Sequence, residues 1–266
     1  MKDVLTCQND HSNYAIYNTK EKIYKNGLRK LKKTSFDVVK GKTNNNSKNG
    51  TSTLEELEKY EKRHLKEKKE KILDLALNND NWEYFVTLTF KDCPLLGYSH
   101  DRCLNLLKLW INNQKHQNPD MRYLIVAEFH KSGRLHFHGI FSNVPKWKLA
   151  KATNPKNGKN LVINGTQIYN LTNYKLGYTT VSKVKYQDRV SSYISKYITK
   201  ELMHLRFKKA FWYSRNLEKP LNDYHYYDSD LKEVFKNEKI LFNDKVNKSD
   251  CHIEVLNYTT LHNIYY

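Results

Sequence analysis

The stretch Arg134-Leu135-His136-Phe137-His138-Gly139 says more about the fold of this chain than any other. In an extended strand the side chains alternate between two faces, so His136 and His138 share one face while Leu135 and Phe137 share the other. We therefore predict a β-strand whose apolar side chains anchor it to a core. The two imidazoles then lie together on the opposite face of a sheet, where they can bind a divalent metal ion.

A carboxylate is available on the preceding run, 122–129, which is also strand-like. A short turn through Lys131-Ser132-Gly133 would join the two runs as a hairpin and bring Glu128 beside His136 and His138. Two imidazoles and one carboxylate, with coordination positions left open, describe a catalytic metal site better than a closed structural one. A His-x-His pair also occurs on strands that bind no metal, and it serves unrelated metalloenzymes, so it indicates a site and not a reaction.

The charge of the chain indicates a polyanionic partner. Its 266 residues include 46 Lys and Arg against 28 Asp and Glu, a formal charge of +18. Such an excess favours nucleic acid or an acidic membrane surface, although an AT-rich coding bias toward Lys and Asn is an alternative explanation. We find no secretory signal and no run of about 18 apolar residues, and therefore expect no membrane partner. The four cysteines are scattered, which is typical of reduced thiols in a cytoplasmic protein.

Changes in composition predict four parts. Residues 1–52 contain few apolar clusters and end in a polar, glycine-bounded stretch, which predicts a flexible basic N-terminal arm. A capping box opens a charged helix over 53–80. Residues 81–217 alternate strands, helices and hairpins, which predicts an α+β domain: an antiparallel sheet with flanking helices, preceded by a helical and disordered extension. Residues 218–266 form a C-terminal extension of unknown role.

Periodicity places the elements of the α+β domain. β-branched and aromatic residues, or an Asn-Gly turn between short apolar runs, predict the strands, and apolar residues at helical spacing predict the helices. The predicted elements are a strand at 84–90, a helix at 98–116, strands at 122–129 and 134–142, a hairpin at 160–169, a strand at 177–184 and a helix at 188–205.

The last predicted helix contains Tyr193-Ile-Ser-Lys-Tyr197-Ile-Thr-Lys200. Tyr193 and Tyr197 are four residues apart, so they share a face about 6 Å apart along the axis. Lys196 and Lys200 each follow a tyrosine by three residues. A nearby ammonium and a metal-bound phosphate can make a phenol, whose pKa is near 10, a usable nucleophile. Because the chain has 20 tyrosines, the helix can also be a packed amphipathic surface.

Together, the metal site, the tyrosine helix and the basic charge indicate transesterification of a nucleic-acid phosphodiester. The motifs and their order resemble those of the HUH endonucleases, specifically the rolling-circle replication initiators of small phages and plasmids. Phe85-Val-Thr-Leu-Thr-Phe90 resembles the first motif of that family, Leu135-His-Phe-His-Gly139 the second, and Tyr193-x-x-Lys-Tyr197-x-x-Lys200 the third. Glu128 is placed like the acidic third metal ligand of the family, and the resemblance covers roughly residues 82–217.

The resemblance implies a metal-dependent endonuclease that nicks one DNA strand at a replication origin. One tyrosine would attack the phosphodiester and form a 5′-phosphotyrosine, releasing a 3′-OH that primes synthesis, and a second tyrosine could rejoin the strand at termination. Tyr193, Tyr197, Lys196 and Lys200 would be catalytic, either tyrosine or both being the nucleophile. The implied partners are single-stranded origin DNA and a helicase and a polymerase of the bacterial host, in the cytoplasm.

The implied cofactor is Mn²⁺ or Mg²⁺ held by Glu128, His136 and His138. Two imidazoles would by themselves favour Zn²⁺ over Mg²⁺, so Mn²⁺ suits the ligands better. Three alternatives stay open: a tyrosine transposase or relaxase of the same fold, a non-catalytic protein that binds single-stranded nucleic acid, and a zinc hydrolase built on a sheet. The second leaves the metal ligands without a role, and the third leaves the tyrosine helix and the charge without one.

Overall fold

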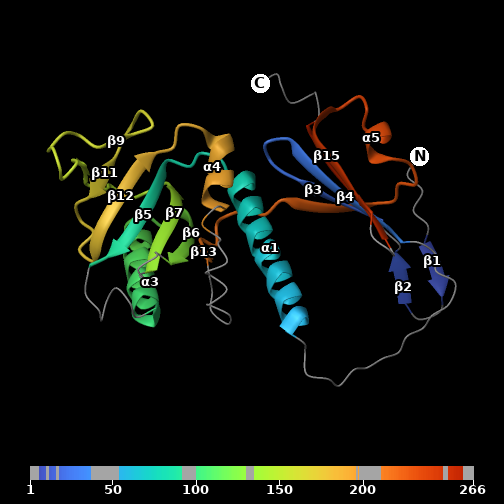
Figure 1. The fold of residues 1–266 in the computed structure, drawn as a ribbon, viewed down its shortest axis with the longest axis horizontal. Helices are drawn as coiled ribbons and strands as arrows, with labels where there is room; N and C mark the ends of the chain where they lie inside the picture. The colour runs from blue at the N-terminus through green and yellow to red at the C-terminus, as the bar shows by residue number, and fades with distance from the viewer. Residues whose placement is uncertain are drawn as a thin grey trace. The chain divides into compact units, whose positions relative to one another are not determined.

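A seven-stranded antiparallel sheet organises the central part of the chain (Figure 1). The strand order is β13-β6-β7-β5-β12-β11-β8. The bounds are β5 Tyr84–Phe90, β6 Arg122–Phe129, β7 Leu135–Ser142, β8 Leu149–Lys151, β11 Tyr169–Leu171, β12 Gly177–Lys183 and β13 Phe211–Tyr213. The helices of this part are α1 Leu54–Asn78, α3 His100–Gln117 and α4 Gln187–Ser195.

The structure is a computed structural model in which the chain divides into two compact units, Ser52–Glu218 and the combination of Met1–Thr51 with Lys219–Tyr266. We refer to them as the central unit and the terminal unit. The residues that the structure describes are 6–9, 12–15, 18–36, 54–91, 100–129, 135–195, 197, 211–247 and 251–259.

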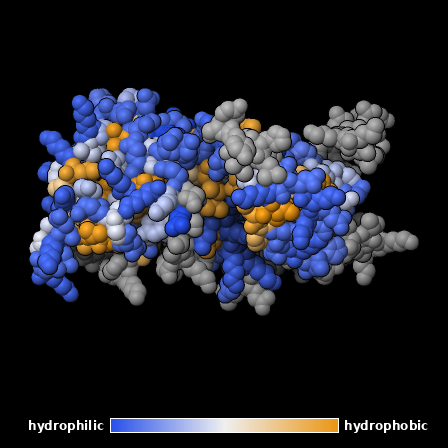
Figure 2. Space-filling model, turned by 90° about the horizontal axis from the view of Figure 1, so that it is seen from above, coloured by the Kyte–Doolittle hydropathy of each residue, from blue (hydrophilic) through white to orange (hydrophobic). Residues whose placement is uncertain are grey.

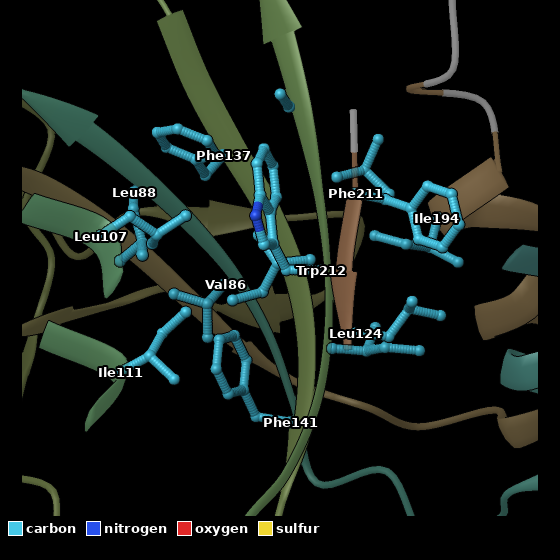
Figure 3. Packing of buried hydrophobic residues seen from close by; sticks show 14 of the residues in the cluster. Val86, Leu88, Leu107, Ile111, Leu124, Phe137, Phe141, Ile194, Phe211 and Trp212 are labelled. Carbon is cyan, nitrogen blue, oxygen red and sulfur yellow. The ribbon is translucent and has the colours of Figure 1, made fainter. Parts of the chain in front are cut away.

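One face of the central sheet carries the main hydrophobic core. Along β5 the burial alternates, with Val86, Leu88 and Phe90 buried on the core face. Phe137 and Phe141 of β7 lie on the same face, and Leu107 and Ile111 of α3 pack against them (Figure 3). Because the alternation of β5 and β7 has a period of two, every second residue is left for the opposite face.

The opposite face is covered in part by α4. Ile194 of α4 is fully buried and belongs to the same continuous cluster as Leu124 of β6 and Phe211 of β13, and Figure 3 shows these three on the other side of the strands from Leu107 and Ile111. Leu124 alternates with Ile125, so the sheet is apolar on both faces at this point. α4 is thereby fixed against the face that also carries the polar residues of β5 and β7.

The predicted α+β class with an antiparallel sheet is confirmed, and most predicted elements lie within two residues of their predicted bounds. The predicted hairpin at 160–169 is the pair β9 Val162–Ile163 and β10 Thr166–Gln167. Asn164 and Gly165 connect these strands with φ values of 47° and 68°. A two-residue hairpin turn requires positive φ at both central positions, which an Asn-Gly pair adopts readily.

The terminal unit contains a five-stranded antiparallel sheet of order β14-β3-β4-β16-β15 and the two-stranded sheet β1-β2. The bounds are β1 Thr6–Asn9, β2 Ser12–Ala15, β3 Thr19–Ile23, β4 Leu28–Phe36, β14 Leu221–His225, β15 Lys239–Asn247 and β16 Cys251–Thr259, with a short helix α5 at Leu231–Val234. The small core of this sheet is formed by Leu31, Leu231, Leu256 and Tyr258.

The sequence predicts an arm at 1–52 and an extension at 218–266, whereas the structure places strands from both segments in one sheet. β4 pairs with β16 along its whole length, from Leu28 opposite Thr259 to Phe36 opposite Cys251. Each segment is poor in apolar residues when read alone, because the small core needs side chains from both ends of the chain. Among the helices of the described residues, none is long and apolar enough to cross a membrane.

Candidate functional site

The three predicted metal ligands lie on the face of the central sheet that α4 partly covers. β6 and β7 are antiparallel neighbours, and their register sets Glu128 directly opposite His136. His138 follows two residues later on β7, so it points to the same face. The predicted hairpin therefore brings the carboxylate beside the two imidazoles, while the turn at 130–134 lies outside the described residues.

The imidazole of His138 is held at both of its nitrogen atoms. Its Nε2 lies 2.6 Å from Oε2 of Glu128, and its Nδ1 lies 3.1 Å from Oγ1 of Thr87. Thr87 is the direct cross-strand neighbour of His138 on β5. Two hydrogen bonds and the surrounding strands thus fix both the position and the ring orientation of this side chain.

Burial lowers the pKa of His138 to about 4, so the ring is neutral at pH 7 and carries a single N–H. The contact with the Glu128 carboxylate places that proton on Nε2, and Thr87 then donates its hydroxyl proton to Nδ1. A hydroxyl group can equally accept a hydrogen bond. Thr87 can therefore also hold the tautomer protonated on Nδ1, whose Nε2 lone pair is the one that coordinates a metal ion.

Both predicted tyrosines reach this site. The rings of Tyr197 and His138 are stacked, with 3.6 Å between their centroids and 16° between their planes. The Tyr197 hydroxyl donates a hydrogen bond to the Tyr193 hydroxyl over 3.0 Å. Tyr193 lies on α4 and Tyr197 two residues beyond its end, so this helix positions both phenols over the polar face of the sheet.

The two phenols have different surroundings. Tyr193 is 44% exposed, whereas Tyr197 is half-buried against His138. Burial raises the pKa of Tyr197 above its ordinary value, and the hydrogen bond to Tyr193 and the charge of Glu128 add to the shift. Tyr197 is therefore held as a neutral hydrogen-bond donor directed at the more accessible hydroxyl of Tyr193.

Phe85 of β5 joins the two tyrosines to the sheet. Its ring centroid is 4.7 Å from that of Tyr193, 5.9 Å from that of Tyr197 and 6.1 Å from that of His138. Edge-to-face and offset stacked pairs at such distances stabilise a defined arrangement of rings. Phe85 thus forms an apolar platform beneath the phenols, next to the polar pair of Glu128 and His138.

Some predicted members of the site are not brought into it by the described structure. Lys196 and Lys200 lie outside the described residues. The coordinating atoms of Glu128, His136 and His138 do not all converge within 4.8 Å, because within the described parts of the chain that closeness is reached only by Glu21, Asp223 and His225. His136 nevertheless shares the face and the strand of His138.

The group of Glu21, Asp223 and His225 lies in the terminal unit, where β3 pairs with β14, and it can hold a metal ion. Nε2 of His225 is 2.8 Å from Oε2 of Glu21 and 3.3 Å from Oδ2 of Asp223. The other oxygen of Glu21 accepts hydrogen bonds from Arg29 and Tyr258, each over 3.0 Å. This group was not found in the sequence, because its members lie about two hundred residues apart and match no spacing motif.

Sequence reasoning also missed Thr87 and Phe85 as parts of the site. A signal was present in their strand, since Phe85, Thr87 and Thr89 alternate with the apolar residues Val86 and Leu88. Threonine at alternate positions indicates a second, polar face. Only the register between β5 and β7 shows that this face meets His138.

Comparison with known protein families finds one similarity. Residues 83–202 match the model of a family described as replication-associated protein ORF2. The matched range is less than half of the chain, and it contains the strands of the candidate site, the helix α4 and both tyrosines. No curated protein and no solved structure matches the chain.

Proposed function

We propose that this protein is a replication initiator that nicks single-stranded DNA at an origin through a tyrosine nucleophile. The observation that carries the proposal is the stacking of Tyr197 on His138, whose Nε2 is at the same time 2.6 Å from Glu128. A nucleophile and metal ligands are useful to each other only when they share one face of the fold. The match to a replication-associated family over the same residues supports the replication role.

The metal ligands in this proposal are Glu128, His136 and His138. Their fit is supported by the neutral state of His138 and by Thr87, which supplies the second hydrogen bond that orients a ligating imidazole. Convergence of all three requires His136 to change its side-chain rotamer. A bound Mn²⁺ or Mg²⁺ would polarise the scissile phosphate and neutralise developing charge there.

In the first step, Oη of Tyr193 attacks the phosphorus of the scissile phosphodiester. A bond forms between Oη and phosphorus, the bond from phosphorus to O3′ breaks, and the leaving oxygen takes up a proton to become a free 3′-OH. Tyr193 is assigned this role because it is the more exposed phenol and accepts a hydrogen bond from Tyr197. That hydrogen bond stabilises negative charge on Oη as the proton of Tyr193 is lost.

Tyr197 would then act at termination. Once Tyr193 is esterified, the neighbouring phenol is the group closest to a newly replicated junction, and transfer between two phosphotyrosine esters conserves the bond energy that rejoining needs. The free 3′-OH made in the first step would prime synthesis by a host polymerase, and a host helicase would open the duplex. Lys196 and Lys200 are proposed to neutralise charge beside each phenol.

The test uses the full-length protein and labelled single-stranded oligonucleotides that tile the replicon carrying its gene. With Mn²⁺ present, we expect a covalent adduct that survives denaturing electrophoresis, and mass spectrometry should find it on a tyrosine peptide of α4. The adduct should vanish with EDTA and in the Tyr193→Phe/Tyr197→Phe double variant. An undiminished adduct in the double variant would refute the assignment. Adducts at transposon ends or transfer origins would favour the transposase or relaxase alternative.

A further inference from the structure

A groove of about 760 Å³ opens on the same face of the central sheet as the candidate site. Its base is formed by residues of β5 and β12, which are hydrogen-bonded neighbours. The β9–β10 hairpin and the start of α4 line its sides (Figure 1). Its size falls within the range of about 300–1,000 Å³ that is typical of sites for small organic ligands.

The charge of the groove is positive. Lys183, Lys185 and Arg189 line it, and no acidic side chain is among its described lining residues. Lys185 also donates a hydrogen bond to the carbonyl of Gly165, which ties the hairpin turn to the end of β12. Figure 2 shows a largely hydrophilic surface, as a chain of charge +18 requires. A groove with three cations and no described carboxylate attracts a polyanion.

The groove also presents an aromatic ring for stacking. Tyr186 is 59% exposed, and the guanidinium carbon of Arg189 lies 4.8 Å from the centre of its ring. This cation–π contact holds the ring in one orientation while leaving much of it accessible. Aromatic rings beside cations are the usual way in which proteins bind unpaired bases together with their phosphates.

The groove is continuous with the proposed catalytic residues. Thr87, which holds His138, and Tyr193 both line it, as does Phe85, whose ring contacts both tyrosines. A strand that lies in the groove therefore leads directly to the Tyr193 hydroxyl. No separate path is needed to bring a phosphate from the groove to the site.

We propose that this groove binds the unpaired nucleotides next to the scissile phosphate, with Tyr186 stacking on a base and Lys183 and Arg189 contacting phosphates. The inference rests on the proposed function, because it names the part of the substrate that the site receives. A duplex does not fit this chemistry, since its bases are already stacked and cannot present a free face to Tyr186.

The test measures binding without chemistry. Fluorescence anisotropy in EDTA would follow the full-length protein with a fluorescein-labelled random single strand of about 16 nucleotides, a typical upper site size. We expect Tyr186→Ala to weaken binding at least about five-fold and Tyr186→Phe to retain it, since the ring is what stacks. The same strand annealed to its complement should bind more weakly than the single strand.

The chain offers a matched control in Tyr60 of α1. This tyrosine is 53% exposed and carries Arg63 at 5.5 Å from its ring centre, but it does not line the groove. Tyr60→Ala should leave binding unchanged. Equal losses for Tyr60→Ala and Tyr186→Ala, no loss for Tyr186→Ala, or a preference for the duplex would each overturn the inference.

Salt dependence separates the phosphate contacts from the base contact. Lys183→Ala and Arg189→Ala should each reduce the slope of log affinity against log salt by about 0.7, the value for one phosphate contact on a single strand, whereas Arg63→Ala should not. An unchanged slope in both groove variants would contradict the proposed phosphate contacts. Because these measurements need no cleavage, a failure of tyrosine chemistry and a failure of groove binding give different results.

Discussion

The phenol ring of Tyr197 stacks on the imidazole of His138, with 3.6 Å between the two ring centroids. The same imidazole is hydrogen-bonded to Glu128, and the Tyr197 hydroxyl is hydrogen-bonded to Tyr193. A single ring thus links the residues proposed to hold the metal ion to the residue proposed to attack the phosphate. Its burial suits it to orient its neighbours, and the more exposed Tyr193 suits the first attack.

The two tyrosines should respond differently to loss of the hydroxyl group. We expect Tyr193→Phe to abolish the first covalent adduct, because it removes the attacking oxygen. Tyr197→Phe keeps the ring on His138 and loses only the hydrogen bond, so the adduct should form about 10- to 100-fold more slowly, the cost of one or two charge-stabilising hydrogen bonds. Single-turnover measurement of adduct formation on one labelled strand checks this difference.

The opposite order would also be informative. If Tyr193→Phe forms the adduct at the wild-type rate and Tyr197→Phe forms none, Tyr197 is the first nucleophile and the assigned roles are reversed. Tyr197→Leu serves as a further variant, since it removes the stacked ring as well as the hydroxyl. We expect it to be slower than Tyr197→Phe, because His138 then loses its aromatic neighbour.

Thr87 should matter for metal affinity even though it is not proposed to touch the metal ion. Its hydroxyl is 3.1 Å from Nδ1 of His138 and is available to fix the ligating tautomer. Loss of such an orienting hydrogen bond typically weakens metal binding about 10- to 100-fold. We expect this loss for Thr87→Val, and near wild-type affinity for Thr87→Ser, when Mn²⁺ binding is measured by electron paramagnetic resonance. Equal affinities for the two variants would exclude an orienting role.

The buried His138 predicts a definite dependence of stability on pH. Burial lowers its pKa from 6.5 to about 4, so between these values the unfolded chain binds a proton that the folded protein does not. The stability is therefore fully present above pH 6.5 and falls as the pH is lowered toward 4, by up to about 3 kcal/mol. Urea unfolding in EDTA at several pH values measures this loss.

His138→Gln is the control for that measurement, because glutamine does not titrate. Its free energy of unfolding should fall less steeply between pH 6.5 and 4 than that of the wild type, although other titrating groups leave a common background slope. Parallel curves for the two proteins would show that His138 takes up its proton in the folded state as readily as in the unfolded state.

The parts of the site that sequence predicted are those that local periodicity encodes. Alternation along β7 placed His136 and His138 on one face, and the hairpin expected before it placed Glu128 opposite His136. The four-residue spacing of Tyr193 and Tyr197 gave neighbouring phenols. Each of these relations depends on residues close in the chain or on one turn, so the sequence alone was sufficient to predict them.

The parts that sequence missed depend on long-range register. Thr87 meets His138 only because β5 pairs with β7 across an intervening helix and strand. The terminal sheet joins Arg29 to Tyr258 and Glu21 to Asp223, pairs separated by about two hundred residues. No local pattern reports such pairings, and the strands involved carry too many lysines to be recognised by hydrophobicity.

The terminal unit should depend strongly on one buried carboxylate. Glu21 is 3% exposed and is bonded to Arg29, His225 and Tyr258, whereas the Asp223 side chain of the same group is 54% exposed. Removing one partner of a buried ion pair typically costs about 3–5 kcal/mol, and removing an exposed partner costs about 1 kcal/mol or less. Glu21→Gln should therefore speed hydrogen exchange at β3 and β14 far more than Asp223→Asn does.

The four tryptophans give an internal control for that comparison, because Trp82, Trp110, Trp147 and Trp212 all lie in the central unit. Their fluorescence transition in urea reports the central core, while hydrogen exchange at β3 and β14 reports the terminal sheet. Added Zn²⁺ or Mn²⁺ should slow exchange at these strands in the wild type and not in Glu21→Gln if the group binds metal, since a ligand that binds only the folded state stabilises it. Equal exchange in Glu21→Gln and Asp223→Asn would mean that the buried carboxylate is not what holds β3 against β14.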